Sequence, residues 1–434
     1  MLGRGRDHAA ASLWGVLEYF AYPFLMFLAT PFFLRWLGQV QYGQWMLLMT
    51  IVGLGGLAGV GMGAAATKDV SAARGRGDQA AALATVRACL SVTLVSSGAL
   101  CLLIILAGIA AAPGLLANMG PPAVVRAIIV IGALVITLEQ LDTVFAGTMR
   151  GMERFDLSAR AEVAAKALLV LGALAVAWWT HSLWAVLITT FSCTLLRLVG
   201  KGGIAAYLLG RIPWPSWHWD DMRAVFAFGK WTWAQSLGAA LYSTADRFLV
   251  GGMLGATALA HYSICLQLAQ QVQTVPSAGA QFLFPAISRR REAGESFRTL
   301  ALRASLLIGA LGVALALGLA LVSHLVLSLW VGKAIADDSW IVLVLLASAF
   351  GVLAINVGPF YVLLGMGRSR FIALINIVAG LATLAAMWLA VSEAGLIGAA
   401  ATRILYGLIL TVSISWTFQF RASAGTDALS NPQE

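Results

Sequence analysis

Apolar residues fill this chain in runs of about twenty, and short polar or basic stretches separate the runs. A helix rises about 1.5 Å per residue, so about twenty apolar residues cross a hydrocarbon core of about 30 Å. The pattern predicts twelve transmembrane helices. Their expected spans are 13–34, 42–64, 88–111, 124–147, 161–179, 183–209, 231–253, 259–284, 304–329, 341–365, 371–391 and 396–420. The expected fold class is therefore all-α, that of a polytopic membrane protein.

Composition excludes several other classes. Hydrophobic residues make up 60% of the chain and charged residues only 11%, whereas soluble domains average about 25% charged residues. The net charge is +9, but the basic residues are spread over short loops and not gathered on one polar module, so no nucleic-acid partner is expected. The four cysteines lie in apolar runs without pair or metal spacing, and no cofactor or metal is predicted. Because Walker, nucleophile-elbow and HExxH motifs are absent from the sequence, an enzyme is not expected.

The distribution of Lys and Arg predicts the orientation. One set of short loops and ends collects 21 basic residues, and the opposite set holds only Arg35, Arg126 and Lys333. Cytoplasmic loops of membrane proteins are enriched in Lys and Arg. Both termini are therefore expected in the cytoplasm, in agreement with an even number of helices.

An internal repeat suggests how the helices are grouped. GMERF at 151–155 recurs as GRSRF at 367–371, and Leu37–Gly38 recurs 217 residues later as Leu254–Gly255. The nearly equal offsets predict a duplicated six-helix unit whose two copies have the same orientation. Chance matching in a Gly/Leu/Arg-rich sequence is the alternative. The expected domains are a six-helix bundle at 1–210, a Trp/Pro-rich interfacial linker on the cytoplasmic leaflet at 211–230, a second six-helix bundle at 231–420 and a cytoplasmic tail at 421–434; a protein-partner site is the alternative for the linker.

Charged side chains inside the predicted helices need an explanation, because each costs about 2.5–3.5 kcal/mol near the helix centre. They lie either in buried ion pairs that join helices or in the lining of a substrate cavity. For Arg247 and Arg403 the cavity is favoured, since only Asp246 is nearby in the sequence to neutralise them. Glu139 and Asp142 share a helix face and either pair with Arg197 or hold a proton for ion coupling. Glu18 is a third candidate for ion coupling, with a solvated or capping role as its alternative.

Neutral polar residues extend this set. Gln267, Gln270 and Gln271 line one face of a predicted helix together with Thr274, and Asn356 lies in a later helix. Such side chains usually form hydrogen bonds to neighbouring helices. Hydrogen-bond donors and acceptors along two turns of one helix are also suited to bind sugar hydroxyls. The predicted substrate cavity comprises Arg247, Arg403, Asp246, Gln267, Gln270, Gln271, Asn356 and Arg197.

The chain resembles the multidrug/oligosaccharidyl-lipid/polysaccharide exporter superfamily, and within it the O-antigen or polysaccharide repeat-unit flippases. The resemblance covers essentially the whole chain. Its carriers are FFLRWLGQVQYGQWMLL at 32–48, GVGMGAAATKDVSAARGRGD at 59–78, TADRFLVGGMLGATALAHYSICLQLA at 244–269 and PAISRRRE at 285–292. Asp246, Arg247, Leu254, Gly255 and Tyr262 match the family pattern. His261 departs from it, because the family often has Gly before the Tyr.

This resemblance implies two six-helix bundles around a central cavity that opens alternately to each side of the bacterial inner membrane. It also implies the transport of an undecaprenyl-diphosphate-linked oligosaccharide for surface polysaccharide synthesis, with polysaccharide polymerase machinery as a further candidate partner. Arg247 and Arg403 suit a diphosphate, and the polyprenyl tail can stay in membrane lipid. The alternatives are a cation-coupled multidrug extrusion antiporter and, from another class, a membrane polymer-assembly enzyme. The absence of a long outer loop argues against the enzyme.

Overall fold

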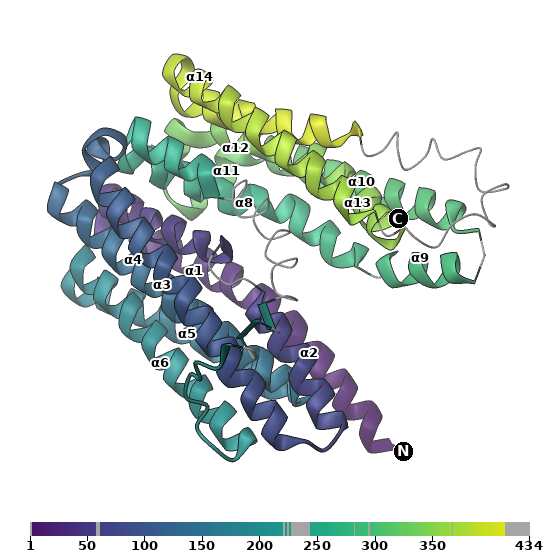
Figure 1. Cartoon of the computed structure of the whole chain (residues 1–434). Coiled ribbons are helices and arrows are strands. Elements are labelled where there is room, and N and C mark those ends of the chain that lie inside the picture. The colour runs from purple at the N-terminus through teal and green to yellow at the C-terminus, as the bar shows by residue number, and fades with distance from the viewer. Residues whose placement is uncertain are drawn as a thin grey trace. The chain divides into compact units, whose positions relative to one another are not determined.

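The computed structural model describes residues 2–57, 61–219, 222–223, 225–226, 244–281, 283–293, 296–366 and 368–412. Within these ranges the regular elements are helices (Figure 1), and seven of them are long and apolar enough to cross a membrane. The chain is therefore a polytopic helical membrane protein. The count of twelve helices stays a prediction, since most of the expected span 231–253 lies outside the described residues.

The chain folds into two compact units, Met1–Ser263 and Ile264–Glu434. The first contains α1 (Leu2–Gly53), η1 (Leu54–Leu57), α2 (Met62–Gly75), α3 (Gln79–Leu115), η2 (Ala117–Met119), α4 (Pro122–Gly151), α5 (Phe155–Thr180), α6 (Leu183–Leu209), a helical segment at 244–254 and the start of α8 (Ala256–Ala280). The second contains the rest of α8, α9 (Leu283–Glu292), α10 (Arg298–Leu321), α11 (Ser323–Trp330), α12 (Lys333–Ile355), α13 (Val357–Gly365) and α14 (Ser369–Leu410). The expected boundaries of two duplicated bundles stay predictions.

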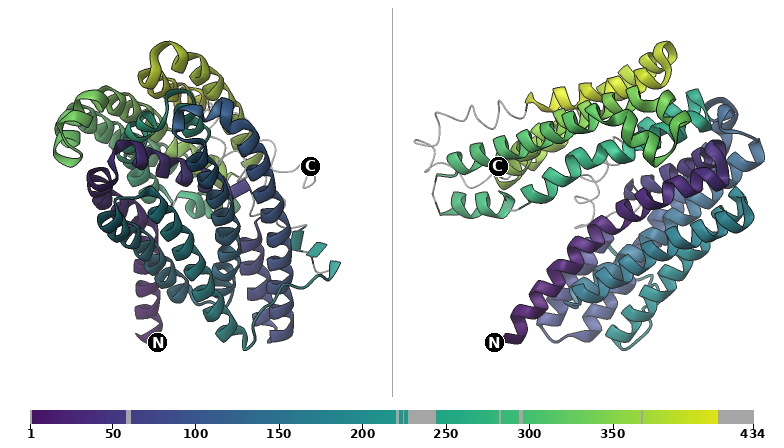
Figure 2. Two further views of the ribbon diagram at one scale, coloured as in Figure 1. Left: turned by 90° about the vertical axis from the view of Figure 1, so that its left-hand side faces the viewer. Right: turned by 180° about the vertical axis from the view of Figure 1, so that it is seen from behind.

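The long element α1 is a helical hairpin that reverses at Gly38, where φ is 77°. The hydroxyls of Thr30 and Tyr42 lie 3.5 Å apart, and the Tyr22 hydroxyl lies 4.0 Å from Met49 Sδ, so the two arms run side by side. In Figure 2 the purple helix runs away from the N-terminus and then turns back on itself. Glycine permits this left-handed turn because it has no Cβ. The reversal separates the expected spans 13–34 and 42–64.

α14 is built in the same way. It reverses at Gly395, with φ of 55°, and the Tyr406 hydroxyl donates to Asn376 Oδ1 of the other arm at 2.6 Å. This reversal lies between the expected spans 371–391 and 396–420. The part of the second span beyond residue 412 lies outside the described residues.

Four expected spans are interrupted, and this corrects the prediction that they are continuous. The helix expected at 42–64 ends at Gly53, within a glycine-rich stretch that disfavours helix, and α2 starts only at Met62. The span 341–365 breaks at Asn356, because Pro359 cannot donate a hydrogen bond to the carbonyl four residues earlier. Breaks also separate α8 from α9 and α10 from α11.

Backbone conformation adds to the case for a repeat. Residues with positive φ occupy turns after the first, third and fifth expected helices of each half, and they recur at similar offsets. Gly255 follows Gly38 by 217 residues, Gly332 follows Gly120 by 212, and Gly395 follows His181 by 214. The two halves therefore share positive-φ residues at similar places as well as sequence motifs, although ψ is 29° at His181 and −132° at Gly395. Their common origin remains an inference from these correspondences.

In the first unit, α4 packs against α1, α2, α3, α5 and α6, and Figure 1 shows α2 to α6 as neighbouring helices. α2 and α4 approach closely at two glycines: a Cβ on Gly147 would lie 2.1 Å from the Gly63 carbonyl oxygen. The Thr67 hydroxyl also donates to the Gly147 carbonyl at 3.2 Å. This packing places polar residues of α2 and α4 next to each other.

In the second unit, α12 packs against α10, α11 and α14, while α13 packs against α9 and α10. Gly358 of α13 has little space, since a Cβ there would lie 2.4 Å from Ser305 Oγ and 2.6 Å from Ser305 Cα of α10. Small residues at such positions let membrane helices approach closely. This part of the second unit is therefore tightly packed.

The interfacial linker expected at 211–230 is described only in part. From Ile212 to His218 the chain has no regular structure, and the Ser91 hydroxyl of α3 donates to the Ser216 carbonyl at 2.7 Å. Trp214, Trp217 and Trp219 remain exposed. The rest of the expected linker, 220–230, lies mostly outside the described residues.

Candidate functional site: a charged cavity in the first unit

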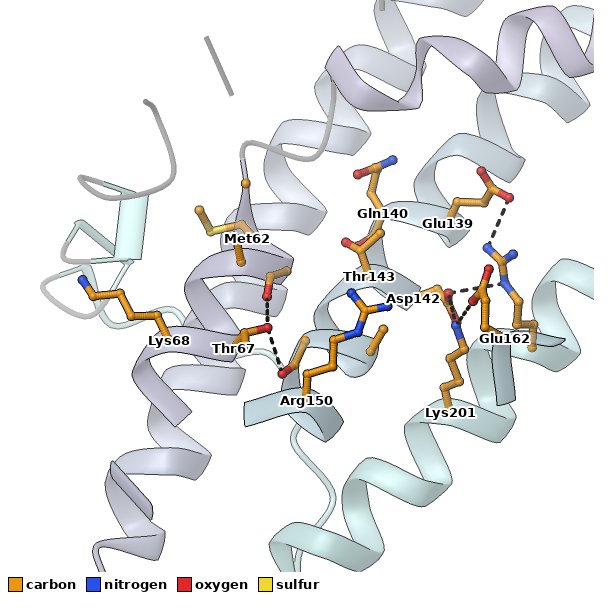
Figure 3. A pocket seen from close by; sticks show the side chains of 16 residues that line it. Met62, Thr67, Lys68, Glu139, Gln140, Asp142, Thr143, Arg150, Glu162 and Lys201 are labelled. Carbon is orange, nitrogen blue, oxygen red and sulfur yellow. Dashed lines mark hydrogen bonds and ion pairs between the residues drawn. The ribbon is translucent and has the colours of Figure 1, made fainter. Parts of the chain in front are cut away.

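A cavity of about 750 Å³ lies among α2, α4, α5 and α6 (Figure 3). Ligand pockets commonly have volumes of about 300–1,000 Å³. Its lining combines glycines and small residues with seven charged side chains: Lys68, Glu139, Asp142, Arg150, Glu162, Arg197 and Lys201. Figure 3 shows Glu139, Asp142, Glu162 and Lys201 gathered on one side, with Lys68 on the other.

Asp142 of α4 lies at the centre of the charged group. Its Oδ2 accepts a hydrogen bond from Lys201 Nζ at 2.7 Å and lies 3.4 Å from Arg197 Nε. Arg197 also donates from Nη2 to Glu139 Oε1 at 3.2 Å. One carboxylate oxygen therefore bridges two cations of α6, and Arg197 bridges two acids of α4.

Lys201 extends the network to α5. Its side chain is 2% exposed, and Nζ also donates to Glu162 Oε2 at 2.5 Å. The other oxygen of Glu162 lies 3.5 Å from Lys166 Nζ. Because an isolated buried ammonium is costly, these two carboxylates account for the burial of Lys201.

Helical spacing brings these side chains together. Glu139 and Asp142 are three residues apart on α4, and Arg197 and Lys201 are four apart on α6. Residues at such spacings share a helix face. The packing of α4 against α6 and of α5 against α6 then brings the faces against one another. We call the six residues Glu139, Asp142, Glu162, Lys166, Arg197 and Lys201 the charge network.

The charge network is balanced but incompletely hydrogen-bonded. It holds three carboxylates and three cations, and the cavity lining as a whole has four cations against three carboxylates. Asp142 Oδ1 is buried without a hydrogen-bond partner among the described residues. An arrangement of this kind can hold an anion on its cations or a proton on its carboxylates.

Three residues singled out in the sequence meet here. Arg197 contacts both Glu139 and Asp142, which is the ion-pair arrangement given above as one of their two alternatives. Their roles in substrate binding and ion coupling stay predictions. The side chain of Glu18, the third candidate for ion coupling, lies outside the described part of the structure.

Three members of the charge network are not among the predicted site residues: Glu162, Lys166 and Lys201. Lys201 is one of the 21 basic residues assigned to the cytoplasmic side, and Glu162 and Lys166 are four residues apart near the start of α5. The available signal was the spacing of Lys201 from Arg197, which repeats on α6 the one-face pattern that drew attention to Glu139 and Asp142. A charge near a helix end is easily assigned to the interface, because long side chains can extend to it.

Asp246 and Arg247 lie in the helical segment 244–254 of the first unit. Asp246 is buried and accepts a hydrogen bond from the Tyr262 hydroxyl at 2.9 Å. Arg247 is half-buried, and its Nε has no hydrogen-bond partner among the described residues. His261, which departs from the family pattern, is buried with its Nε2 3.2 Å from Gln39 Oε1.

The remaining predicted residues lie in the second unit. Arg403 is 3% exposed, with its guanidinium 5.3 Å from the centre of the Phe350 ring. Asn356 donates to the Val352 and Gly407 carbonyls at 3.0 and 3.2 Å.

Gln267, Gln270 and Gln271 are half-buried on α8, and Gln271 donates to the Gln267 carbonyl at 3.3 Å. The expected shared cavity for Arg247, Arg403 and these polar residues stays a prediction.

Comparisons with known proteins identify the family of this chain. Residues 34–340, more than half of the chain, match the model of a family described as polysaccharide biosynthesis protein. A Shigella flexneri protein, named provisionally as an O-antigen transporter, is 24% identical over 412 residues, which cover 94% of this chain and 96% of that protein.

Two solved structures share the fold. An inward-facing multidrug resistance transporter of the MATE family, in the MOP superfamily, has a TM-score of 0.77 at 13% identity and covers 96% of this chain and 99% of its own. The lipid II flippase MurJ, in an inward closed conformation, also has a TM-score of 0.77, at 10% identity, and covers 94% of this chain and 87% of its own.

Proposed function

Because the chain belongs to the polysaccharide biosynthesis protein family, we propose that this membrane transporter is a flippase for undecaprenyl-diphosphate-linked oligosaccharide repeat units. The repeat unit moves from the cytoplasmic to the outer leaflet of the bacterial inner membrane by alternating access, for surface polysaccharide synthesis. Both termini lie in the cytoplasm. The Shigella flexneri relative, matched over nearly its whole length, supports this class of cargo.

The charged cavity of the first unit carries this proposal. A diphosphate and its sugars are costly to place in hydrocarbon, whereas a polyprenyl chain is not. The cavity supplies Lys68, Arg150, Arg197 and Lys201 within a bundle of membrane-spanning helices. Arg and Lys are the residues that bind phosphates, and the bundle keeps their charges away from lipid.

Other residues contribute to the same function. These residues lie outside the charged cavity: in this proposal Arg247 and Arg403 are further cations for the diphosphate, Asp246 is a further polar residue of the substrate path, and Gln267, Gln270, Gln271 and Asn356 contact the sugars. The hydrogen bonds of Gln271 and Asn356 already join backbone carbonyls within the unit. Engaging a sugar therefore requires their amide groups to exchange these partners.

The test is surface polysaccharide in a bacterial strain that lacks this gene. The wild-type chain is expected to restore polysaccharide. Arg247→Ala and Arg403→Ala are each expected to abolish it while the protein still inserts at normal abundance, because the anion loses a cation. Normal polysaccharide in both variants would remove these two arginines from the proposed site.

A drug-susceptibility assay on the same strains separates transport of a glycolipid from multidrug extrusion. A flippase leaves the inhibitory concentrations of cationic drugs unchanged when it is deleted. A deletion strain that becomes drug-sensitive but makes normal polysaccharide would contradict the proposed function.

A further inference from the structure

We propose that Asp142 is an exchangeable counter-ion: a diphosphate displaces its carboxylate from Arg197 and Lys201, and the released carboxylate takes up one proton. This inference rests on the proposed function, because it assumes a diphosphate cargo. It adds a direct link between cargo binding and proton uptake at one residue of the first unit.

The contacts single out Asp142 among the three acids of the charge network. Its Oδ2 contacts both cations of α6, at 2.7 Å from Lys201 Nζ and 3.4 Å from Arg197 Nε. In the ion pairs of the described residues, Glu139 instead pairs with Arg197, and Glu162 with the two lysines. Removing Asp142 therefore takes one counter-ion from an adjacent guanidinium and ammonium at the same time, while Glu139 and Glu162 remain beside them. Such a pair matches the neighbouring anionic groups of a diphosphate.

A second observation points to a ligand at the same carboxylate. The Asp142 side chain is 5% exposed and lines the cavity, and its Oδ1 has no hydrogen-bond partner among the described residues. A buried carboxylate oxygen without a donor is unfavourable. A proton on this oxygen converts it into a hydrogen-bond donor and removes the charge.

The exchange follows from competition for the same cations. Opposite charges within about 4–6 Å stabilise an ionised carboxylate. When the diphosphate takes over Arg197 and Lys201, the Asp142 carboxylate stays in a poorly hydrated site beside an anion. Burial and the like charge both then favour the neutral carboxyl form. The proton comes from cytoplasmic water and returns to water when the diphosphate leaves, so no other reactant is needed.

Other charged groups set the surroundings of Asp142. Glu139 lies one turn away on α4 and keeps Arg197 partly neutralised, while Glu162 does the same for Lys201. Among the described side chains, the charged groups around Asp142 are Lys68 on α2, Glu139 and Arg150 on α4, Glu162 and Lys166 on α5, and Arg197 and Lys201 on α6; α1 and α3 supply no residue to the described cavity lining.

The experiment measures proton uptake as the full-length protein in detergent binds farnesyl diphosphate. Calorimetric titrations at pH 8 in two buffers of different ionisation enthalpy give the number of protons exchanged. Wild-type protein is expected to take up about one proton per bound diphosphate. Asp142→Asn is expected to take up none and to bind about tenfold more tightly, because the amide no longer competes for the two cations.

A matched control is Glu153→Gln. Glu153 pairs with Arg74 at the exposed end of α4 and is not part of the cavity lining. This variant is expected to keep the wild-type affinity and proton uptake. If Asp142→Asn fails to fold, the wild-type protein still provides the test. Uptake of one proton predicts an affinity that rises up to about tenfold for each unit by which pH falls between 9 and 7.5.

The possible outcomes distinguish the counter-ion role of Asp142 from the proposed flippase function. Binding of farnesyl diphosphate without proton uptake, or with an affinity independent of pH, overturns the counter-ion role and leaves the flippase proposal in place. Proton uptake that persists in Asp142→Asn also overturns it. Absence of binding together with failure to restore surface polysaccharide overturns both proposals.

Discussion

Corresponding positions in the two halves have very different chemistry. With the 216-residue offset of the GMERF and GRSRF motifs, Glu139 and Asp142 correspond to Ile355 and Gly358, and Glu162 corresponds to Val378. The first half has a cavity with a charge network at this place. In the second half, Gly358 instead packs tightly against Ser305.

This difference indicates that the two halves have different roles in the protein. Polar contacts of the second unit include neutral hydrogen bonds, such as those of Asn356 with Gly407 and of Tyr406 with Asn376, and a cation–π contact of Arg403. These contacts hold helices together. The first unit carries balanced, largely buried charges in one cavity. We infer that the first unit responds to charge and that the region around Gly358 serves packing.

The strongest test of the comparison removes a cation from the charge network. Lys201→Met leaves Asp142 without its closest cation and Glu162 without its ammonium at 2.5 Å. Breaking a buried ion pair in this way costs about 3–5 kcal/mol. We expect a large fall in the melting temperature of the protein in detergent. The double variant Lys201→Met/Asp142→Asn should recover part of the loss, and an unchanged melting temperature in the single variant would contradict the buried network.

The next test concerns Gly358, which the 216-residue offset pairs with Asp142 of the first half. Gly358→Ala places a Cβ within 2.4 Å of Ser305 Oγ, and overpacking of this kind costs about 1–3 kcal/mol. The control is Gly279→Ala in α8, where a Cβ meets no atom within 4 Å. We expect thermal unfolding at lower temperature for the first variant only. Equal melting temperatures in the two variants would show that α10 and α13 are not tightly packed.

A smaller effect is expected for the aromatic partner of Arg403. Phe350→Leu keeps an apolar side chain but removes the ring that lies 5.3 Å from the guanidinium. A cation–π contact contributes about 0.5–2 kcal/mol. Thermal unfolding should report a loss of about 1 kcal/mol. The same loss on replacing Phe350 in an Arg403→Met background would mean that the contact with Arg403 contributes nothing to stability.

The smallest effect on the melting temperature is expected for Lys68, an exposed residue of the cavity lining. Lys68 lies 3.9 Å from Asp69, and the two side chains are 59% and 33% exposed. Exposed ion pairs contribute about 0–1 kcal/mol. Lys68→Ala should leave the melting temperature nearly unchanged. Measured beside Lys201→Met, it shows whether burial, and not the presence of a lysine in the lining, determines the energetic importance of a cation.

The sequence was sufficient for the helical class and for several helix ends. The span 183–209 matches α6, and the reversals at Gly38 and Gly395 fall between expected spans. The interruptions were harder to foresee, because an apolar run has similar hydropathy whether its helix is continuous or broken. Only the glycines before Met62 and Pro359 supplied a local signal.

The site was less accessible from the sequence than the fold. Spacing along α4 was enough to place Glu139 and Asp142 on one face, but the partners on α5 and α6 depend on how each helix is rotated about its own axis. Hydropathy does not determine that rotation in helices with polar groups at several angles. The importance of Lys201 emerged only from its contacts with Asp142 and Glu162.

The Trp-rich segment after α6 gives the protein an intrinsic optical signal. Trp214, Trp217 and Trp219 are 69%, 63% and 72% exposed, whereas Trp45 is 1% exposed. Indole rings favour the headgroup layer of a bilayer, and the bond from Ser91 holds the backbone of this segment at Ser216. A fluorescence quencher attached to lipid headgroups should therefore quench these three indoles more strongly than Trp45. Trp178 and Trp179 are exposed too, so the depth of the segment is given by the difference in quenching between the wild type and a variant with Phe at 214, 217 and 219.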